Sequence, residues 1–558
     1  MNSFIISGNI IDIANESIFP ASIVIEDGRI ASIVSQKGKS FNNYILPGFI
    51  DSHVHIESSM LVPSEFARLA VAHGTVASVS DPHEIANVLG IEGIWFMIAN
   101  GENVPFKFYF GAPSCVPATT FETAGSAITT DDIRRLINNH KIKYLSEMMN
   151  YPGVIYQSAD VLEKLKIAID CGKPIDGHAP GLRGDLLKKY ISAGIQHDNN
   201  ESIITTNPCI TTDHETFELE EASEKLGLGM KILIREGSAA KNFDALFTVI
   251  DNWPKMVMFC SDDKHPDDLV EGHINKLVSK AVKSGCNLFN VLNAACINPV
   301  LHYNLDVGTL KTGDSADFIV VDNLSEFNII ATYINGEKVA ENGKSLIPKI
   351  TITFVNKFNA NSKLQEEYRI ESKGKKIKVI EVIENQLITE SIIADEYVSN
   401  GNIISNIDND ILKLTVINRY EDAKPAVAFV KGFGLKKGAI ASSVAHDSHN
   451  IIAVGTSDDE ICSAVNAIIE SKGGMAVACG REIDILPLPI AGLMSMDDGY
   501  TVAENYSNLN KKAKLLGSHL QAPFMTLSFM ALLVIPKLKL SDQGLFDGEK
   551  FEFTDIHV

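Results

Sequence analysis

The chain has 558 residues, 45% hydrophobic and 21% charged, a composition that excludes a long disordered protein and predicts about two to four globular domains. Its formal net charge of −21 argues against nucleic acid and anionic membranes as partners, because negative surfaces repel each other. The first residues, MNSFIISGNI, lack the basic start and long apolar stretch of a secretory signal. The eight cysteines form no CxxC pair, which favours free thiols in a reducing cytoplasm.

Residues 1–46 alternate apolar and polar side chains and are rich in β-branched residues, as in FIISGNIIDI and SIVIEDGRIASIV. Glycine and asparagine separate these runs, so the pattern predicts short antiparallel strands. A similar pattern returns at residues 305–350, in GTLKTGDSADFIVVD and TYINGEKVAENG. We expect the two flanks to build one small β-sandwich domain.

Between the flanks, residues 47–304 alternate short apolar runs with helical stretches. The runs include TVASVSDPHE, IKYLSEM, MKILIREGS and MVMFCSDD, and the helical stretches include SEFARLAVAHG and SADVLEKLKIAIDCG. This repeat predicts a parallel sheet with helices outside it. Seven clear strands and an uncertain one near 195–214, within about 250 residues, favour a (β/α)8 TIM-like barrel.

Residues 355–558 predict a separate C-terminal α/β domain. Its longest apolar run, residues 522–536, is too short to cross a bilayer and has prolines at both ends. We therefore expect this run to lie in a core, and we expect no membrane partner.

The first motif with chemical potential is PGFIDSHVH, at residues 47–55. Side chains at i and i+2 of a strand point to the same side. His53 and His55 can therefore reach one metal ion from the end of a strand.

Potential ligands also follow later apolar runs. They are Asp81, His83 and Glu84 after the second run, Glu147 in the fourth, His178 after the fifth, Asp213, His214 and Glu215 after the uncertain sixth, and Asp262 after the eighth. In a parallel barrel these ends converge on one mouth, where the active site lies. We therefore expect a metal site there.

Imidazole and carboxylate ligands without thiolate suit zinc, manganese or iron(II). So many ligands favour two metal ions that share a bridging carboxylate. Glu147 is the expected bridge, because the fourth strand lies between the histidine pairs. Cys260 should point away and pack.

Several motifs resemble those of the adenine deaminase family, within the amidohydrolase superfamily. They are PGFIDSHVHIESSMLVPSEFAR, SDPHEIANVLG, PSCVPATTFETAG, EMMNYPGV, DGHAPGL, REGSAAKN and CSDDKHPDDL. The resemblance covers residues 1–345 and extends to the C-terminal region. It implies hydrolysis of adenine to hypoxanthine and ammonia in purine salvage. The alternative is an amidohydrolase acting on a cyclic amide or related heterocycle, but Glu147 stands where those enzymes usually carry a bridging lysine.

The resemblance also implies a binuclear site of two divalent ions, manganese or iron(II), with zinc as a further option. The implied ligands are His53, His55, Glu147, His178, His214 and Asp262. Adenine is the expected small-molecule partner, and we expect a homo-oligomer, a dimer.

In the implied mechanism, Asp262 accepts the proton of the attacking water and His214 polarises the attacked centre. An acid near purine N1 is also required, and Glu84 and Glu215 are both candidates. His83, with Glu84, matches a substrate or further metal contact. Arg235 and Glu236 either contact the base or form a structural turn.

One departure from the family pattern concerns the sixth strand. The family's DHE motif closely follows AGI, whereas here QHDNNESIITTNPCITT separates Ile195 from Asp213. His197 is therefore a rival to His214 as the ligand. A second histidine cluster, His446 to His449, is either a lid that completes the purine pocket or a surface turn.

Overall fold

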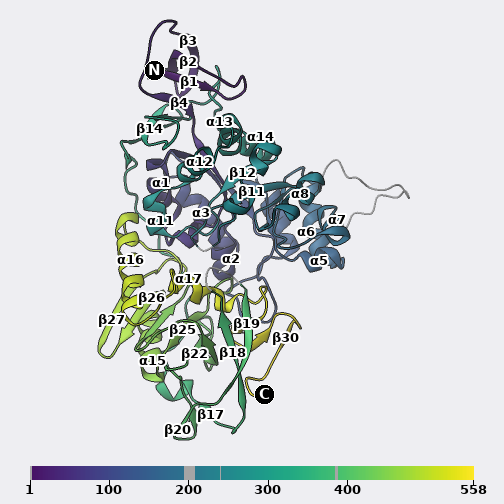
Figure 1. The fold of residues 1–558 in the computed structure, drawn as a ribbon, viewed down its shortest axis with the longest axis vertical. Coiled ribbons are helices and arrows are strands. Elements are labelled where there is room, and N and C mark those ends of the chain that lie inside the picture. Colours follow the sequence, from purple (N-terminus) through teal and green to yellow (C-terminus); the bar gives the residue numbers. More distant parts are fainter. Residues whose placement is uncertain (1–2, 194–207, 239, 384–387) are drawn as a thin grey trace, which may run out of the picture. The chain divides into compact units, whose positions relative to one another are not determined.

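A computed structural model describes residues 3–193, 208–238, 240–383 and 388–558 (Figure 1). The chain forms two compact units. The first comprises Met1–His83, Trp95–Cys115 and Thr129–Thr351, and the second comprises Glu84–Ile94, Val116–Ile128 and Ile352–Val558. The second unit thus takes two short segments from within the barrel sequence.

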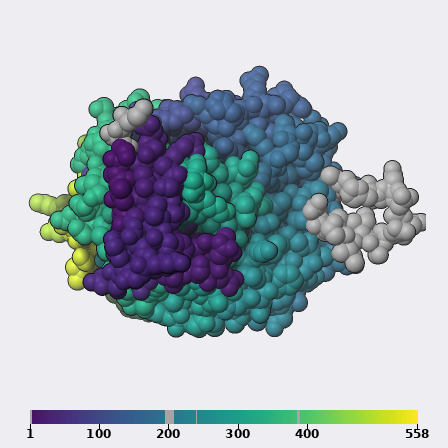
Figure 2. Space-filling model, turned by 90° about the horizontal axis from the view of Figure 1, so that it is seen from above, coloured from purple at the N-terminus to yellow at the C-terminus, as the bar shows by residue number. Residues whose placement is uncertain are grey.

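Strands from both flanks of the barrel join in one eight-stranded sheet of the first unit. Its order is β16-β15-β14-β13-β4-β1-β2-β3. The link is β4, which pairs parallel with β1 and antiparallel with β13. Figure 2 shows the purple N-terminal strands at the surface, beside teal residues of the same unit. The strands are β1 (Ser3–Asp12), β2 (Ser17–Glu26), β3 (Arg29–Ser35), β4 (Tyr44–Pro47), β13 (Phe318–Val321), β14 (Ile329–Ile334), β15 (Glu337–Glu341) and β16 (Lys344–Ser345).

Eight parallel strands form the barrel, in one sheet of five and one of three. A bridge between Val54 and Asp262 joins the sheets at one seam, and the Thr211 N–H donates to the Ile175 carbonyl at the other, at 2.8 Å. The strands are β5 (Phe49–Val54), β6 (Thr75–Ser80), β7 (Lys107–Ala112), β8 (Ile142–Met148), β9 (Ile175–Gly177), β10 (Thr212–Asp213), β11 (Lys231–Arg235) and β12 (Val257–Cys260).

Helices follow the barrel strands. In α6, Val161, Leu165 and Ala168 recur at helical spacing and are buried, as expected of an amphipathic helix. The longer helices are α1 (Pro63–Ala72), α2 (His83–Leu89), α3 (Ile91–Gly101), α4 (Thr130–Ile137), α6 (Ala159–Asp170), α7 (Gly184–Ile191), α8 (Leu219–Gly227) and α12 (Ile274–Lys283). The shorter ones are α5 (Tyr151–Ile155), α9 (Phe243–Leu246), α10 (Val249–Asn252), α11 (Pro266–Glu271), α13 (Leu288–Leu292) and α14 (Asn298–Tyr303).

The uncertain sixth strand is β10, which has two residues and leads directly into His214. The rival residue, His197, lies outside the described residues.

The second unit is built on another eight-stranded sheet, in the order β19-β18-β23-β22-β25-β24-β26-β27, with α15 packed on it. The strands are β18 (Lys376–Val382), β19 (Thr389–Asp395), β22 (Ile411–Ile417), β23 (Ala426–Lys431), β24 (Ala439–Ser442), β25 (Ile451–Gly455), β26 (Gly474–Cys479) and β27 (Glu482–Pro487). The helices are α15 (Asp458–Ser471), α16 (Gly499–Leu515) and α17 (Pro523–Ser528). Two three-stranded sheets contain β17 (Ile370–Glu371), β20 (Val398–Ser399) and β21 (Asn402–Ile403), and β28 (Leu538–Ser541), β29 (Gly544–Asp547) and β30 (Glu552–Phe553).

These elements confirm the predicted mixed α/β class, with a TIM-like barrel and a further sheet-rich domain. The apolar run at 522–536 contains α17, and its Phe524 and Met530 are buried, as expected for a core segment. Among the described residues, no helix combines the length and apolar character needed to span a membrane.

Candidate active site

The six predicted metal ligands lie together in the first unit. His53 lies on β5 and Glu147 on β8, and the other four follow β5, β9, β10 and β12 within one or two residues. Because the strands are parallel, their carboxyl ends meet at one end of the barrel. Five of the six residues are buried, and the His178 side chain is 15% exposed.

Glu147 lies between two pairs of histidines. Its Oε1 is 3.3 Å from His55 Nε2 and 3.9 Å from His53 Nε2. Its Oε2 is 2.8 Å from His178 Nδ1 and 3.3 Å from His214 Nε2. Each carboxylate oxygen therefore faces a different pair of imidazoles.

Asp262 contacts the first-strand histidines through one oxygen and Arg235 through the other. Its Oδ1 is 3.1 Å from His55 Nε2 and 3.6 Å from His53 Nε2. Its Oδ2 accepts a hydrogen bond from Arg235 Nη1 at 2.7 Å. The backbone of Asp262 is in the left-handed region, with φ 52°. Such conformations are costly for residues other than glycine and concentrate at functional sites.

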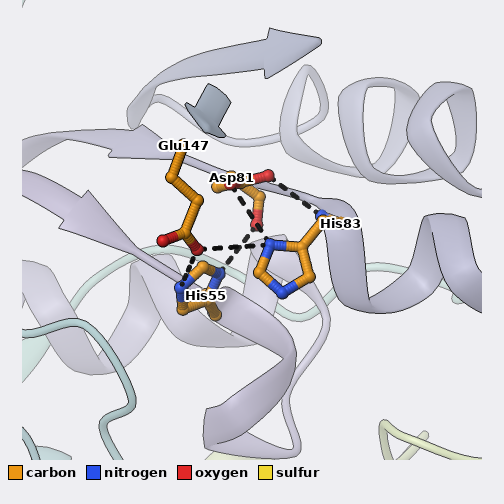
Figure 3. A group of neighbouring side chains, drawn as sticks. All are labelled: His55, Asp81, His83 and Glu147. Atoms are coloured by element: carbon orange, nitrogen blue, oxygen red, sulfur yellow. Dashed lines mark hydrogen bonds and ion pairs between the residues drawn. The ribbon is translucent and has the colours of Figure 1, made fainter. Parts of the chain in front are cut away.

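His55, Asp81, His83 and Glu147 form a neighbouring group (Figure 3). His83 Nδ1 is 3.2 Å from Asp81 Oδ2 and 3.5 Å from Glu147 Oε1. His55 Nδ1 is 3.2 Å from the Asp81 carbonyl oxygen. Sequence reasoning noted Asp81 beside His83 but gave it no separate role. The signal was its place in SDPHE, directly after a strand.

Buried charges separate the pKa values within this cluster. Burial, together with nearby His214 and His55, lowers the pKa of His53 well below its usual value. Burial opposes the ionisation of Glu147 and Asp262. Nevertheless, His178 and Arg235 respectively help lower the pKa of these carboxyls well below their usual range. At neutral pH His53 is therefore a neutral imidazole, and Glu147 and Asp262 are carboxylates. Despite burial, these carboxylates raise the pKa of His55 well above its usual value, and Glu147 helps raise the pKa of His214 to about 9.

Of the predicted substrate contacts, Glu215 and Arg235 belong to this cluster. Arg235 is 1% exposed and pairs with both oxygens of the Glu215 carboxylate. Glu215 Oε1 is 3.5 Å from His214 Nε2. Glu236 instead forms an ion pair with Lys280 on α12, at 3.3 Å.

Glu84 belongs to the second unit, where its carboxylate contacts two histidines. Its Oε1 is 2.5 Å from His446 Nδ1, and its Oε2 contacts His449 Nε2. Burial lowers the pKa of His449 to about 4, so this imidazole is neutral. The Ala445 N–H donates to His449 Nδ1, which leaves the proton on Nε2, facing Glu84. The sequence analysis predicted Glu84 as a candidate acid and as a substrate or further metal contact. It did not anticipate these partners, because 362 residues separate Glu84 from His446.

Two family models together match most of the chain. The amidohydrolase family model matches residues 44–339, and the adenine deaminase C-terminal domain model matches residues 386–552. The adenine deaminase of Sulfurovum sp. (strain NBC37-1) is 56% identical, over 98% of both chains. That of Salinibacter ruber is 52% identical over 100% of this chain and 99% of its own, and that of Borreliella burgdorferi is 49% identical over the whole of both. The chain therefore belongs to the adenine deaminase family, within the amidohydrolases.

Proposed function

We propose that this protein hydrolyses adenine to hypoxanthine and ammonia and that the reaction takes place at the carboxyl end of the barrel. The observation that carries this proposal is Glu147, whose two oxygens face different histidine pairs where parallel strands end. The relatives named adenine deaminases, about half identical over their full length, support the choice of substrate.

The cluster fits two divalent cations. Its donors are imidazole nitrogens and carboxylate oxygens, and the ligand atoms of each group lie within 4.8 Å of one another. We propose His53, His55, Glu147, His178, His214 and Asp262 as the ligands, and manganese or iron(II) as the metal, with zinc as a further option. When bound, such cations supply the Lewis acidity that makes water a strong nucleophile at neutral pH.

Asp262 is the proposed acceptor of the water proton. Arg235 holds Oδ2, so Oδ1 stays on the side of His53 and His55. Carboxylates placed in this way act as a general base and then as a general acid towards the leaving ammonia. His214 is the proposed group that polarises the attacked carbon.

The Glu215 carboxylate pairs with the Arg235 guanidinium. A carboxylate accepts hydrogen bonds, so we assign Glu215 to an amino or ring N–H group of the bound base. His83 is a further metal or substrate contact in this proposal. Glu84 remains a predicted acid, and Glu236 a predicted contact.

Cytoplasmic location and a homodimeric state remain predictions. All eight cysteines are free, which supports a reducing compartment.

The direct test is ammonia release from adenine by the purified protein loaded with Mn²⁺ or Fe²⁺. We expect turnover of adenine and none of a hydantoin, the cyclic amide that tests the alternative. Asp262→Asn should lower kcat by about 10²–10⁴-fold, because it removes the general base. Asp263→Asn is the matched control and should be milder, because Asp263 accepts the Ser58 hydroxyl at 2.5 Å. Turnover of the hydantoin alone would contradict the proposal.

A further inference from the structure

A second buried polar network lies beside the proposed ligands. None of the ligand side chains takes part in it. It joins Asp51 on β5, Thr75 on β6, Ser261 after β12 and His273 before α12. All four residues are at most 3% exposed. A buried carboxylate is costly unless it is hydrogen-bonded, so its partners indicate what it does.

Asp51 uses both carboxylate oxygens. Its Oδ1 accepts the Ser261 N–H at 2.9 Å and the His53 N–H at 3.5 Å. Its Oδ2 accepts the Ser261 hydroxyl and lies 2.8 Å from His273 Nε2. Asp51 therefore contacts the backbone N–H of His53, a proposed ligand on β5, and that of Ser261, which directly precedes the proposed ligand Asp262.

His273 fixes the orientation of Asp51. Its other ring nitrogen, Nδ1, is 2.7 Å from the Thr75 hydroxyl, so both nitrogens of the ring are engaged. The ring also packs edge-on against Phe66, with centroids 5.7 Å apart. A ring held at three points keeps the carboxylate at one place in the barrel wall.

Ser261 directly precedes Asp262, the residue in the left-handed conformation. The Asp262 N–H donates to the His53 carbonyl at 2.9 Å, and the His55 N–H donates to the Asp262 carbonyl at 3.3 Å. The register of β5 against β6 is also irregular between Asp51 and Val54. The two bonds of Asp262 form the parallel bridge between Val54 and Asp262, so this segment pairs with β5 although Asp262 itself departs from strand conformation. Asp51 adds a bond to the N–H of the residue before it, Ser261.

We propose that Asp51 is a positioning residue for Asp262. With His273 and Ser261, it maintains the backbone conformation that directs the Asp262 carboxylate towards His53 and His55. Arg235 acts on the side chain of Asp262, whereas Asp51 acts on the backbone. The inference rests on the proposed function, in which Asp262 is the general base.

The test compares Asp51→Asn with Asp317→Asn. Asp317 is a matched control in the same unit: it is 1% exposed and accepts the N–H groups of Gly308 and Asn335, both at 2.8 Å, and the Lys107 ammonium at 2.7 Å. We expect Asp51→Asn, at saturating Mn²⁺, to lower kcat by about 10–100-fold with KM within about threefold, because a misplaced base slows chemistry more than binding. Asp317→Asn should lower Tm and leave kcat within about twofold.

Two smaller changes keep the test decisive if Asp51→Asn fails to fold. His273→Gln should lower kcat less than Asp51→Asn does, and Ser261→Ala, which removes one hydroxyl, should lower it by about 3–10-fold. Unchanged kcat in Ser261→Ala, or in fully metal-loaded Asp51→Asn, would overturn the inference.

Crystal structures of the metal-free variants give a readout independent of turnover. Residue 262 should leave the left-handed region in Asp51→Asn and keep it in Asp317→Asn. A left-handed Asp262 in the Asp51→Asn protein would also overturn the inference. Absence of adenine turnover in the unaltered protein would contradict the proposed function instead, and the backbone comparison would still test the role of Asp51.

Discussion

The Arg235 guanidinium connects Asp262 to Glu215. It donates to Asp262 Oδ2 at 2.7 Å and, through Nη2, to Glu215 Oε2 at 3.0 Å, and it is 1% exposed. One buried cation thus compensates two buried carboxylates that come from different strand ends. The planar fork of arginine suits this double role, and a lysine ammonium does not reproduce it.

Arg235→Gln should therefore affect both stability and rate. Removing one partner of a buried ion pair costs about 3–5 kcal/mol, so Tm should fall. We also expect kcat for adenine to fall by about 10²-fold, because Asp262 loses the group that orients it. The Tm and kcat of Arg235→Lys should lie between those of the unaltered protein and those of Arg235→Gln.

The control for Arg235 is Lys280→Gln. Lys280 pairs with Glu236 and is 37% exposed, and such pairs contribute about 0–1 kcal/mol. Its Tm should stay close to that of the unaltered protein. Equal Tm and kcat in the unaltered protein and Arg235→Gln would contradict the role given to Arg235.

Metal content tests the ligand set directly. The purified protein should hold about two divalent ions, because the ligands form two groups around Glu147. His55→Ala should lose at least one of them, as measured by elemental analysis. His140→Ala, a change at an exposed histidine, should keep both. Full metal content and activity in His55→Ala would remove the first strand from the proposed site.

Substitutions of the two histidines near the sixth strand should have opposite effects on activity. His214 Nε2 is 3.3 Å from Glu147 Oε2, so His214→Ala should abolish adenine turnover and weaken metal binding. His197→Ala should keep most activity. Steady-state kinetics of both variants decides between them, and loss of activity in His197→Ala alone would show that the strand ends at the other histidine.

His302 should make stability depend on pH away from the proposed site. Burial, followed by the nearby Lys231, lowers its pKa to about 3 in the folded protein. A histidine in the unfolded chain has a pKa of about 6.5, so below that pH the unfolded chain binds a proton that the folded chain does not bind. The stabilisation is full above about pH 6.5 and is lost progressively as the pH falls towards 3.

His302→Gln separates this effect from other acid-sensitive groups. The variant also loses the hydrogen-bonding contact with the Thr211 hydroxyl, at 3.2 Å, so it should have the lower Tm at pH 7.5. The difference in Tm between the two proteins should narrow at pH 5. A difference that stays constant with pH would contradict the shift assigned to His302.

The hydrophobic periodicity and the order of apolar and helical stretches along the chain were enough to predict the fold class. Apolar runs that alternate with helical stretches predicted a parallel barrel, and the structure confirms it. The pattern is informative because a strand buried on both faces needs apolar residues at nearly every position. The step of two residues between His53 and His55 is likewise a local property of a strand. Residues at successive strand ends can therefore be grouped from the sequence alone.

Tertiary structure decided which of those polar groups face one another. Arg235 could be read as a substrate contact or as part of a turn, but the alignment of three strand ends puts it between Glu215 and Asp262. Glu84 follows His83 in the chain, yet its carboxylate contacts His446 and His449 of the second unit. In the sequence, Asp51 is one residue of the PGFIDSHVH motif. Its contact with Ser261 arises only because the fold places β5 beside the segment after β12. Local patterns specify where a side chain starts, whereas its partners depend on strand register and on segments hundreds of residues away, which only the packed chain brings together.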